Sequence, residues 1–212
     1  MRLYSYVVRY DSGFAPNPFF GVCTLATCKP DIRKGAELGD WVVGTGSADK
    51  RFGRGGFLVY AMQVTESLTL RQYWGDPRFR SKRPNLRGSN KQASGDNIYR
   101  WDTDEAKWCQ LDSYHSRANG TPNPEHVRKD TGVNRVLAST HFVYFGGHGP
   151  KIPDRFRNYN GVDVCKRGQG HRAISDMSLI SDFAEWIEST GRHGYVGSPL
   201  DWTAGCRPTV AA

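Results

Sequence analysis

Basic side chains surround two glycines in a short segment near residue 170. The segment contains Lys166, Arg167, Gly168, Gly170, His171 and Arg172. Backbone N–H groups of a flexible loop and charged side chains can both donate hydrogen bonds to phosphate oxygens. We therefore predict a phosphate site formed by Arg167, Gly170, His171 and Arg172, with a basic surface turn as the plainer alternative.

Three other segments join polar side chains to glycine or proline. They are a loop over residues 11–17, residues 29–33, and residues 39–47, where glycines bracket a short strand. Glycine lets the backbone approach an anion or a base edge closely. Lys29 and Arg33 are predicted to contact phosphate. The predicted contacts to a base or nucleotide are Asn17, Asp40, Trp41, Gly44, Gly46, Ser47, Asp96 and Asn97.

The chain carries a formal charge of +8, from 29 lysines and arginines against 21 acidic residues. Such an excess favours polyanions, because each neutralised phosphate releases counterions. Residues 78–100 are especially basic, and Asp96 is their one acidic residue. We predict that Arg78 and Lys82 contact phosphate, and that replacing Lys82 and Arg83 by Glu weakens binding regardless of base sequence. The alternative is a solvated loop.

A complete catalytic motif is absent from the sequence. It holds no HExxH, P-loop or GxSxG pattern, and the spacing within Ser-Tyr-His-Ser at residues 113–116 does not make a triad. Six residues are possible acid–base groups, although each is more often structural: Asp11, Asp40, Asp96, His115, His148 and His171. Asp11 and His171 are the preferred candidates. An enzyme is therefore the minor alternative to a binding protein.

The cysteines do not suggest a disulfide framework or a metal site. Their number is odd and they contain no CxxC pair: Cys23, Cys28, Cys109, Cys165 and Cys206. Cys23 and Cys28 would bind zinc only with partners that the sequence does not identify. We expect reduced, mostly buried thiols, no metal and no cofactor.

Hydrophobic patterning predicts a single domain over residues 1–191. Strands are expected at residues 3–10, 41–43, 57–65 and 135–145, and an amphipathic helix from residue 175 to 189. Residues 192–212 are predicted to be a tail rich in Gly, Ser and Pro. Because no apolar run is long enough to cross a membrane and the first residues lack a secretory signal, we expect a cytoplasmic protein that does not bind membranes.

Several segments follow one another in a particular order: RYDSGFAPNPFFGVCTLATCKPDIRKGAELGDWVVGTGS, LVYAMQVTESLTLRQYWGDPRF, GDNIYRW and GQGHR. This order resembles the nucleotide-modification-associated domains of the second type, over about residues 3–190. The resemblance implies a role beside DNA or nucleotide base modification in bacteria and their phages, a role that rests largely on genomic association.

A further resemblance is to PUA-like barrels of the EVE and ASCH kind, which contain a GD-x-V strand, a V-x-E strand and a D-P loop. Here these would be residues 39–42, 64–66 and 76–77. The resemblance implies an α+β fold with a PUA-like β-barrel core, peripheral helices and long loops. It also implies a pocket with an aromatic wall from Trp41, Tyr73 or Trp74, of which Trp41 is preferred and would be partly exposed to stack on a base. The long basic insertion and the glycine-rich C-terminal loops depart from that pattern.

The preferred function is binding of a modified base, a nucleotide or a nucleic acid, with DNA favoured, in connection with base modification. One alternative is an enzyme that modifies or cleaves a nucleotide or DNA base, using Asp11 or His171 as general acid–base. The other is a protein-interaction module in a phage-defence or modification operon, whose partner would be a protein of that operon.

Overall fold

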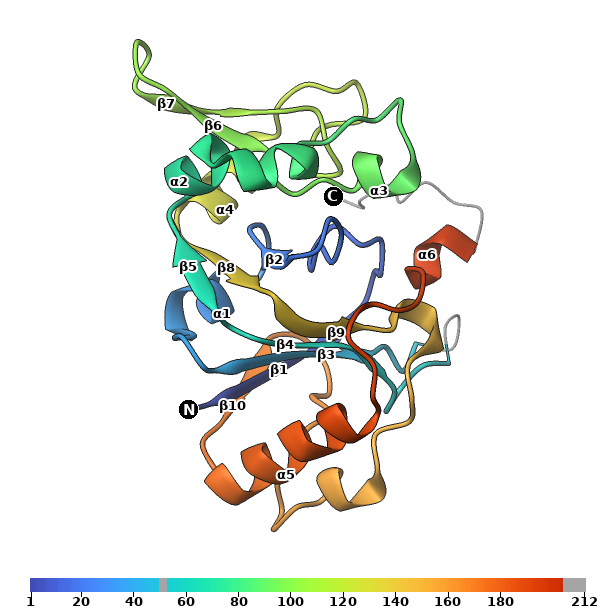
Figure 1. Cartoon of the computed structure of the whole chain (residues 1–212). Helices are drawn as coiled ribbons and strands as arrows, with labels where there is room; N and C mark the ends of the chain where they lie inside the picture. The colour runs from blue at the N-terminus through green and yellow to red at the C-terminus, as the bar shows by residue number, and fades with distance from the viewer. Residues whose placement is uncertain (50–52, 204–212) are drawn as a thin grey trace.

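Three β-sheets and their covering helices form the computed structural model, which describes residues 1–49 and 53–203 (Figure 1). The main sheet has the strand order β10-β1-β3-β4-β9-β11. In that order the strands are His171–Ile174, Leu3–Val8, Trp41–Gly46, Leu58–Gln63, His141–Tyr144 and Gly194–Tyr195. The pairs β1–β3 and β9–β11 are parallel, and the other neighbours are antiparallel.

A second sheet, β2-β8-β5, continues from the first. Its strands are Cys23–Leu25, Val136–Ser139 and Glu66–Leu68. Only two residues separate β4 from β5, and only Thr140 separates β8 from β9. The chain of β4–β5 and the chain of β8–β9 therefore run side by side, antiparallel, and bend together from the first sheet into the second. The predicted strand at residues 135–145 is two strands for this reason, since the Ser139 hydroxyl donates to the carbonyl of His141 at the bend (2.8 Å).

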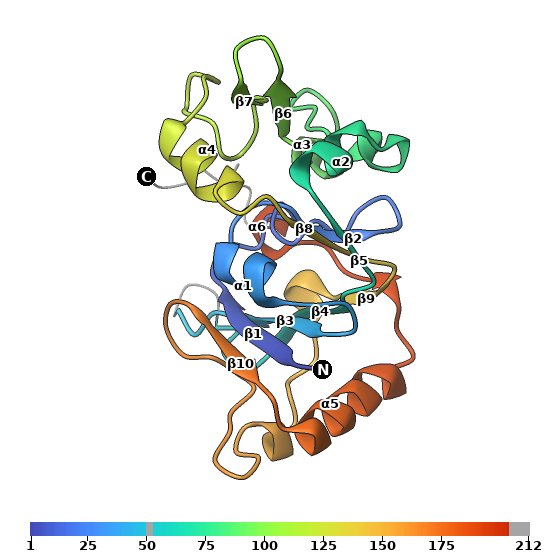
Figure 2. The same ribbon diagram turned by 90° about the vertical axis from the view of Figure 1, so that its left-hand side faces the viewer.

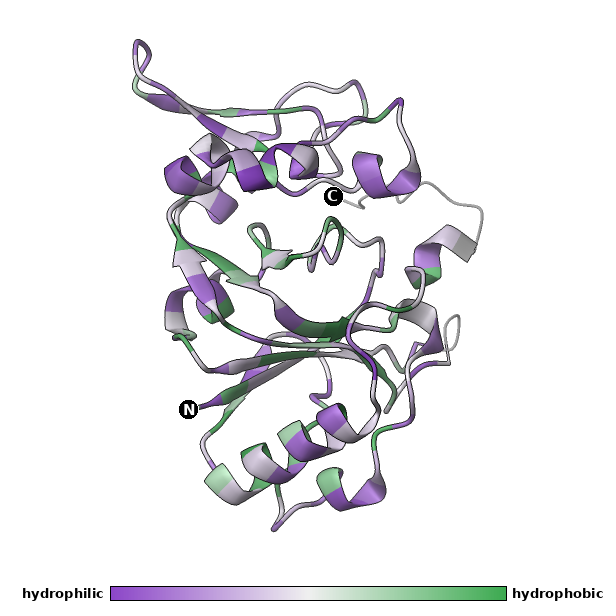
Figure 3. Ribbon diagram, viewed as in Figure 1, coloured by the Kyte–Doolittle hydropathy of each residue, from purple (hydrophilic) through white to green (hydrophobic). Residues whose placement is uncertain are grey.

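Apolar residues cover both faces of the main sheet, and its strands are the greenest part of Figure 3. On one face, Phe183 and Ile187 of α5 (Met177–Ser189) pack against Val43 and Ala61. The helix begins at Asp176, whose carboxylate accepts a hydrogen bond from the N–H of Leu179 (3.0 Å). The helix predicted at residues 175–189 is thus confirmed. The opposite face packs against β2, β8 and α1 (Pro30–Gly35).

A third layer lies beyond the second sheet. It consists of α2 (Leu70–Gly75), η1 (Pro77–Lys82), α3 (Asn90–Ala93), the hairpin β6–β7 (Tyr99–Asp102, Lys107–Gln110) and α4 (Pro124–Thr131). Phe79, Ile98 and Tyr99 are buried in its core. The basic stretch of residues 78–100 is therefore anchored by apolar side chains and is not one exposed loop.

The last described residues belong to the same packed unit. Strand β11 forms an edge of the main sheet, and the turns η2 (Gly146–His148) and η3 (Asp154–Phe156) follow β9. The short helix α6 (Leu200–Thr203) lies near the end of β1, where the indole N–H of Trp202 donates to the carbonyl of Ser12 (3.0 Å). The predicted tail is therefore packed against the domain as far as residue 203.

The mixed α and β composition is confirmed, but a barrel is not. Strands β10 and β11 are the two edges of the main sheet, and no pairing joins them in the part of the chain that is described. The bent strands lead into the second sheet, so they do not close the first one on itself. Among residues 1–49 and 53–203, no helix has the length and apolar character needed to cross a membrane.

Candidate functional site

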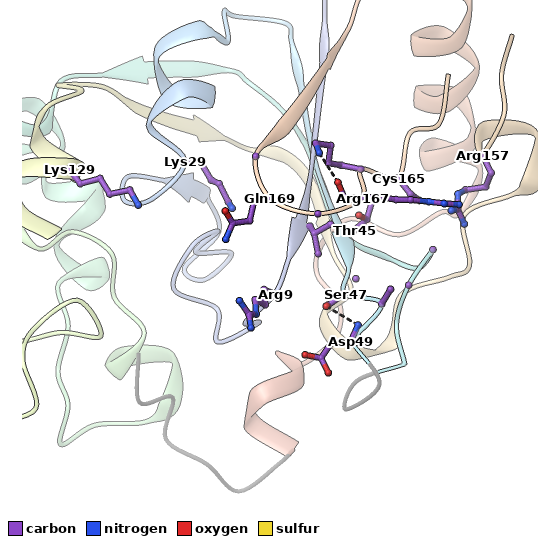
Figure 4. Close-up of a pocket in the computed structure, with 18 residues that line it drawn as sticks. Arg9, Lys29, Thr45, Ser47, Asp49, Lys129, Arg157, Cys165, Arg167 and Gln169 are labelled. Atoms are coloured by element: carbon purple, nitrogen blue, oxygen red, sulfur yellow. Dashed lines mark hydrogen bonds between the residues drawn. The ribbon is translucent and has the colours of Figure 1, made fainter. Parts of the chain in front are cut away.

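A cation-lined cavity of about 1000 Å³ lies beside the ends of β1 and β3 (Figure 4). Its basic lining residues come from five separate segments: Arg9, Lys29, Lys129, Arg157, Lys166 and Arg167. Arg157 is paired with Asp163, with 2.9 Å between Nε and Oδ1. Among the described residues that line the cavity, Asp49 is the acidic one. Positive charge thus dominates the cavity wall.

Local backbone geometry shapes this cavity. Gly46 ends β3, where a Cβ atom would overlap the backbone of Arg54, so a side chain cannot replace its hydrogen. Gly168 and Gly170 have φ angles of 73° and 83°, in the left-handed region that favours glycine. These two glycines let the loop that carries Arg167 and Gln169 run along the cavity wall. Figure 4 shows Gln169 beside Lys29.

A smaller cavity of about 320 Å³ shares Lys29, Lys129 and Gly170 with the larger one. In Figure 2, α1, α4 and the loop before β10 lie on the same side of the molecule. Cys28, just before α1, lines the smaller cavity together with His115, His126 and Asp130. The two cavities therefore form one groove, with cations along it and a cysteine–histidine cluster at one end.

Cys28, His115 and Asp130 form a hydrogen-bonded chain. The Cys28 Sγ lies 3.3 Å from Nε2 of His115, and Nδ1 of His115 lies 2.7 Å from Oδ2 of Asp130. Asp130 also accepts hydrogen bonds from the Cys28 backbone N–H (2.9 Å) and from the Tyr99 hydroxyl (2.8 Å). Asp130 thus holds the imidazole by one nitrogen and leaves the other facing the thiol.

The electrostatics of the groove favour a charged imidazole. Burial disfavours the charged ring of His115, but the bonds to Asp130 and Cys28 outweigh burial and raise the pKa of His115 to about 10. Burial acts against the Asp130 carboxylate too, yet His115 and Tyr99 lower its pKa. Burial, then His115, lowers the pKa of His126, whose ring lies 4.1 Å from that of His115. The contacts with Asp130 and Cys28 therefore favour the protonated form of the His115 ring.

Arg33 holds the segments of this cluster together. It was predicted to contact phosphate, but its side chain is fully buried. The guanidinium donates to the carbonyls of Cys28 (2.9 Å), Asp130 (2.7 Å), Val133 (2.9 Å) and Arg135 (2.8 Å). The guanidinium is buried and its hydrogen bonds go to backbone carbonyls, so it does not reach a phosphate in the groove. The predicted phosphate contact of Arg33 is therefore wrong.

Several of the predicted residues do meet at the groove. Lys29, Gly46, Ser47, Arg167 and Gly170 line the larger cavity, and His171 lines the smaller one.

Arg172 and Arg78, by contrast, have protein partners and line neither cavity. Arg172 donates to the carbonyl of Asp163 (2.8 Å). Arg78 is exposed and forms ion pairs with Glu66 and Asp76, each at 2.7 Å.

The predicted base-stacking wall is not exposed. Trp41 is only 3% exposed and packs in the core beneath α5, with its ring against His141. Gly44 packs beneath the ring of Tyr60. The prediction that Trp41 is partly exposed in a pocket is wrong, because its β3 position faces the helix-covered side of the sheet.

The predicted polar readers of a base are buried and occupied by protein partners. Asp40 accepts hydrogen bonds from the N–H groups of Arg2 (2.6 Å) and Glu37 (2.9 Å). Asp96 accepts from the hydroxyls of Thr24 and Tyr73, each at 2.7 Å. The Asn17 and Asn97 amides donate to backbone carbonyls. These residues fasten loops to the core and do not face the groove.

Asp11, a predicted acid–base candidate, lines neither cavity. Burial raises its pKa to about 6, but its carboxylate accepts hydrogen bonds from the hydroxyl of Tyr144 and the N–H of Leu200 (2.9 Å). It joins β1 to the segment before α6.

Lys82 lies inside the third layer and not on a phosphate-binding surface. It is 1% exposed, and its ammonium donates to the backbone carbonyl (3.0 Å) and the side-chain oxygen (2.6 Å) of Asn17. Burial lowers the pKa of Lys82 to about 8, although Asp96 opposes that change. The predicted phosphate contact is therefore wrong.

Replacing Lys82 with Met should lower the free energy of unfolding by about 3 kcal/mol, because it leaves Asn17 and buried Asp96 without their cationic partner. Chemical denaturation of the variant and the parent measures the difference. Arg87→Met, on the exposed part of the same stretch, is the control and should change stability by less than about 0.5 kcal/mol. A loss below about 1 kcal/mol for Lys82→Met would contradict the buried role.

The sequence marked His115 as a possible acid–base group but did not link it to Cys28 or Asp130. Cys28 and His115 are 87 residues apart, and Asp130 follows His115 by 15. Arg9 and Lys129 were also missed as groove residues. No short motif links these positions, because the fold alone brings them together.

Comparison with known proteins supplies one match. A family model described as nucleotide modification associated domain 2 matches residues 1–206. Neither the curated proteins nor the solved structures contain a match. The family model covers nearly the whole chain, including all three segments that supply Cys28, His115 and Asp130. The chain therefore belongs to the nucleotide modification associated domain 2 family.

Proposed function

We propose that this domain binds the phosphates of a nucleotide or nucleic acid in the cation-lined cavity. The observation that carries the proposal is the convergence of Arg9, Lys29, Lys129, Lys166 and Arg167 on one cavity. The family, whose description links it to nucleotide modification, supports the choice of anion.

The electrostatics of Lys29 support an anionic ligand. Burial lowers the pKa of Lys29, Lys129 lowers it further, and Cys28 opposes the change. Like charges crowd each other here, and a bound phosphate would relieve that repulsion. The volume of about 1000 Å³ is at the upper end for small-molecule sites, which leaves room for a nucleotide or a short piece of single strand.

Recognition beyond phosphate would use hydrogen bonds rather than the stacking that Trp41 was expected to supply. Thr45, Ser47 and Gln169 line the cavity and carry hydroxyl or amide groups. Such groups can pair with a sugar hydroxyl or a base edge.

The test compares binding of a deoxynucleoside triphosphate and of a labelled 12-nucleotide single-stranded DNA. The variant is the double substitution Lys166→Ala and Arg167→Ala. It should weaken binding about tenfold or more and reduce the dependence of log K on log salt by roughly 1.4–1.8. A stronger effect on the triphosphate than on the DNA would identify a free nucleotide as the ligand.

A matched control removes the same two charge types from the β6–β7 hairpin, with Arg100→Ala and Lys107→Ala. Both residues are exposed and line neither cavity. Equal losses in the two double variants would show that net charge alone drives binding and would reject the site. Absence of any binding to both ligands would reject the function.

A further inference from the structure

We propose that Cys28 is a catalytic nucleophile, activated by His115 and Asp130, that cleaves an amide or ester in a phosphate-bearing substrate. The nucleophile stands on the geometry of the cluster itself. The phosphate-bearing nature of the substrate rests on the function proposed above.

The cluster has the parts that thiol catalysis needs. A nucleophile requires a base within reach, and that base requires a group that fixes its orientation. Sγ and Nε2 are 3.3 Å apart, and the carboxylate binds the opposite ring nitrogen at 2.7 Å. Asp130 is itself held by the Cys28 N–H and the Tyr99 hydroxyl, so carboxylate, ring and thiol form one connected unit.

Cys28 differs from the other described thiols. Cys23 and Cys165 are buried, and burial raises the pKa of Cys23 to about 12 and that of Cys165 to about 11. Cys109 is half-buried like Cys28, but its thiol contacts the carboxylate of Asp102 at 4.0 Å, and it lines neither cavity. Cys165 also lines the larger cavity, but among residues 1–49 and 53–203 only Cys28 has a histidine partner.

The reaction balances without a redox partner. The proton shared by Cys28 and His115 lies on Nε2 as the sulfur forms a bond to the carbonyl carbon, and the C–N or C–O bond breaks as His115 gives that proton to the leaving group. Water then attacks the thioester while His115 takes its proton, and the C–S bond breaks. The products are a carboxylic acid and an amine or alcohol, and the Cys28–His115 pair is restored with its shared proton.

The groove indicates where the rest of the substrate lies. Lys29 follows Cys28 directly in the chain, and Lys29, Lys129 and Gly170 line both cavities. A phosphate held by the cations would place a group attached to it near the thiol. We infer an acyl group carried on a nucleotide or on another phosphate-bearing compound.

A metal site is the competing explanation of the same residues. His115, His126 and Asp130 offer ligand atoms within 4.8 Å of one another. However, the two Asp130 oxygens already accept bonds from Cys28, Tyr99 and His115, and the remaining nitrogen of His115 faces the Cys28 sulfur. This arrangement orients an imidazole toward a thiol and leaves Asp130 little capacity for a cation.

The test is the rate at which the intact protein is alkylated at pH 7, followed at each cysteine by peptide mass spectrometry. Iodoacetamide is the neutral reagent and iodoacetate the anionic one, with Cys109 as the internal control. Because the Nε2 atom of His115 lies 3.3 Å from the sulfur and can take up the thiol proton, Cys28 should react with iodoacetamide about tenfold faster than Cys109. Iodoacetate should favour Cys28 further, since cations surround it.

The outcomes separate the two proposals. Equal iodoacetamide rates at Cys28 and Cys109 would overturn the nucleophile, whatever the protein binds. Fast reaction with iodoacetamide without a preference for iodoacetate would support the nucleophile and count against the anion-binding groove. One equivalent of zinc in protein purified without chelator, together with an unreactive Cys28, would overturn the proposal in favour of a metal site.

Discussion

Replacing His115 with Gln should slow acyl transfer to Cys28 by about 10²- to 10⁴-fold. Glutamine keeps much of the side-chain volume but cannot exchange a proton with the thiol, which lies 3.3 Å from the ring nitrogen in the parent. The assay uses 4-nitrophenyl acetate as an activated ester. Release of nitrophenol gives the rate, and mass spectrometry of the Cys28 peptide detects the acetyl group.

Two controls make this result specific. Cys28→Ser should abolish acetylation at that peptide. His193→Gln replaces an exposed histidine that lines neither cavity and should leave the rate near that of the parent. If the His115→Gln protein retains its fold by circular dichroism and acetylates Cys28 at the parental rate, His115 is not the base.

Replacing Arg33 with Ala should lower the free energy of unfolding by about 5 kcal/mol or more. The substitution leaves four backbone carbonyls without their donor, one of them buried and three part-buried, at roughly 1–3 kcal/mol each, and it leaves a space where the buried side chain packed. The acceptors belong to the Cys28 turn, the end of α4 and the segment before β8. Denaturant titration measures the loss, and a variant that does not fold at all agrees with it.

Arg135→Ala is the matched control. Arg135 also makes several hydrogen bonds and pairs with Glu37 at 3.1 Å, but these contacts are solvent-accessible. Its loss should cost about 1 kcal/mol or less. Similar losses in both variants would show that the burial of Arg33 has no special effect.

The structure changes the expected effect of replacing both Lys82 and Arg83 with Glu. Glutamates at these positions were expected to weaken polyanion binding at an exposed loop. Lys82 is buried against Asn17, and Arg83 donates to the carbonyl of Trp74 (2.7 Å) with its guanidinium over the Trp74 ring. We therefore expect the double substitution to lower the stability of the fold, so that weaker binding would not identify a phosphate contact. Composition showed that the stretch is basic but not which of its charges are enclosed.

Local patterns determined several features of this protein. The period of apolar residues and the Asp176 cap specify α5, because both act within one helix. The alternating residues of β4 specify a strand. The glycines and cations of residues 166–170 predicted part of the groove, because a loop with positive φ angles and charged neighbours needs only its own sequence.

Tertiary structure alone decided the rest. The bend of β4–β5 and β8–β9 into a second sheet replaced the expected barrel, because strand closure depends on pairing between distant segments. The same packing buried Trp41 and Lys82 and brought Cys28 to His115 across 87 residues. Residue types in the sequence showed which chemical groups are present. Which of those groups lie together depends on long-range contacts, because burial and hydrogen bonding depend on segments that are distant in the chain.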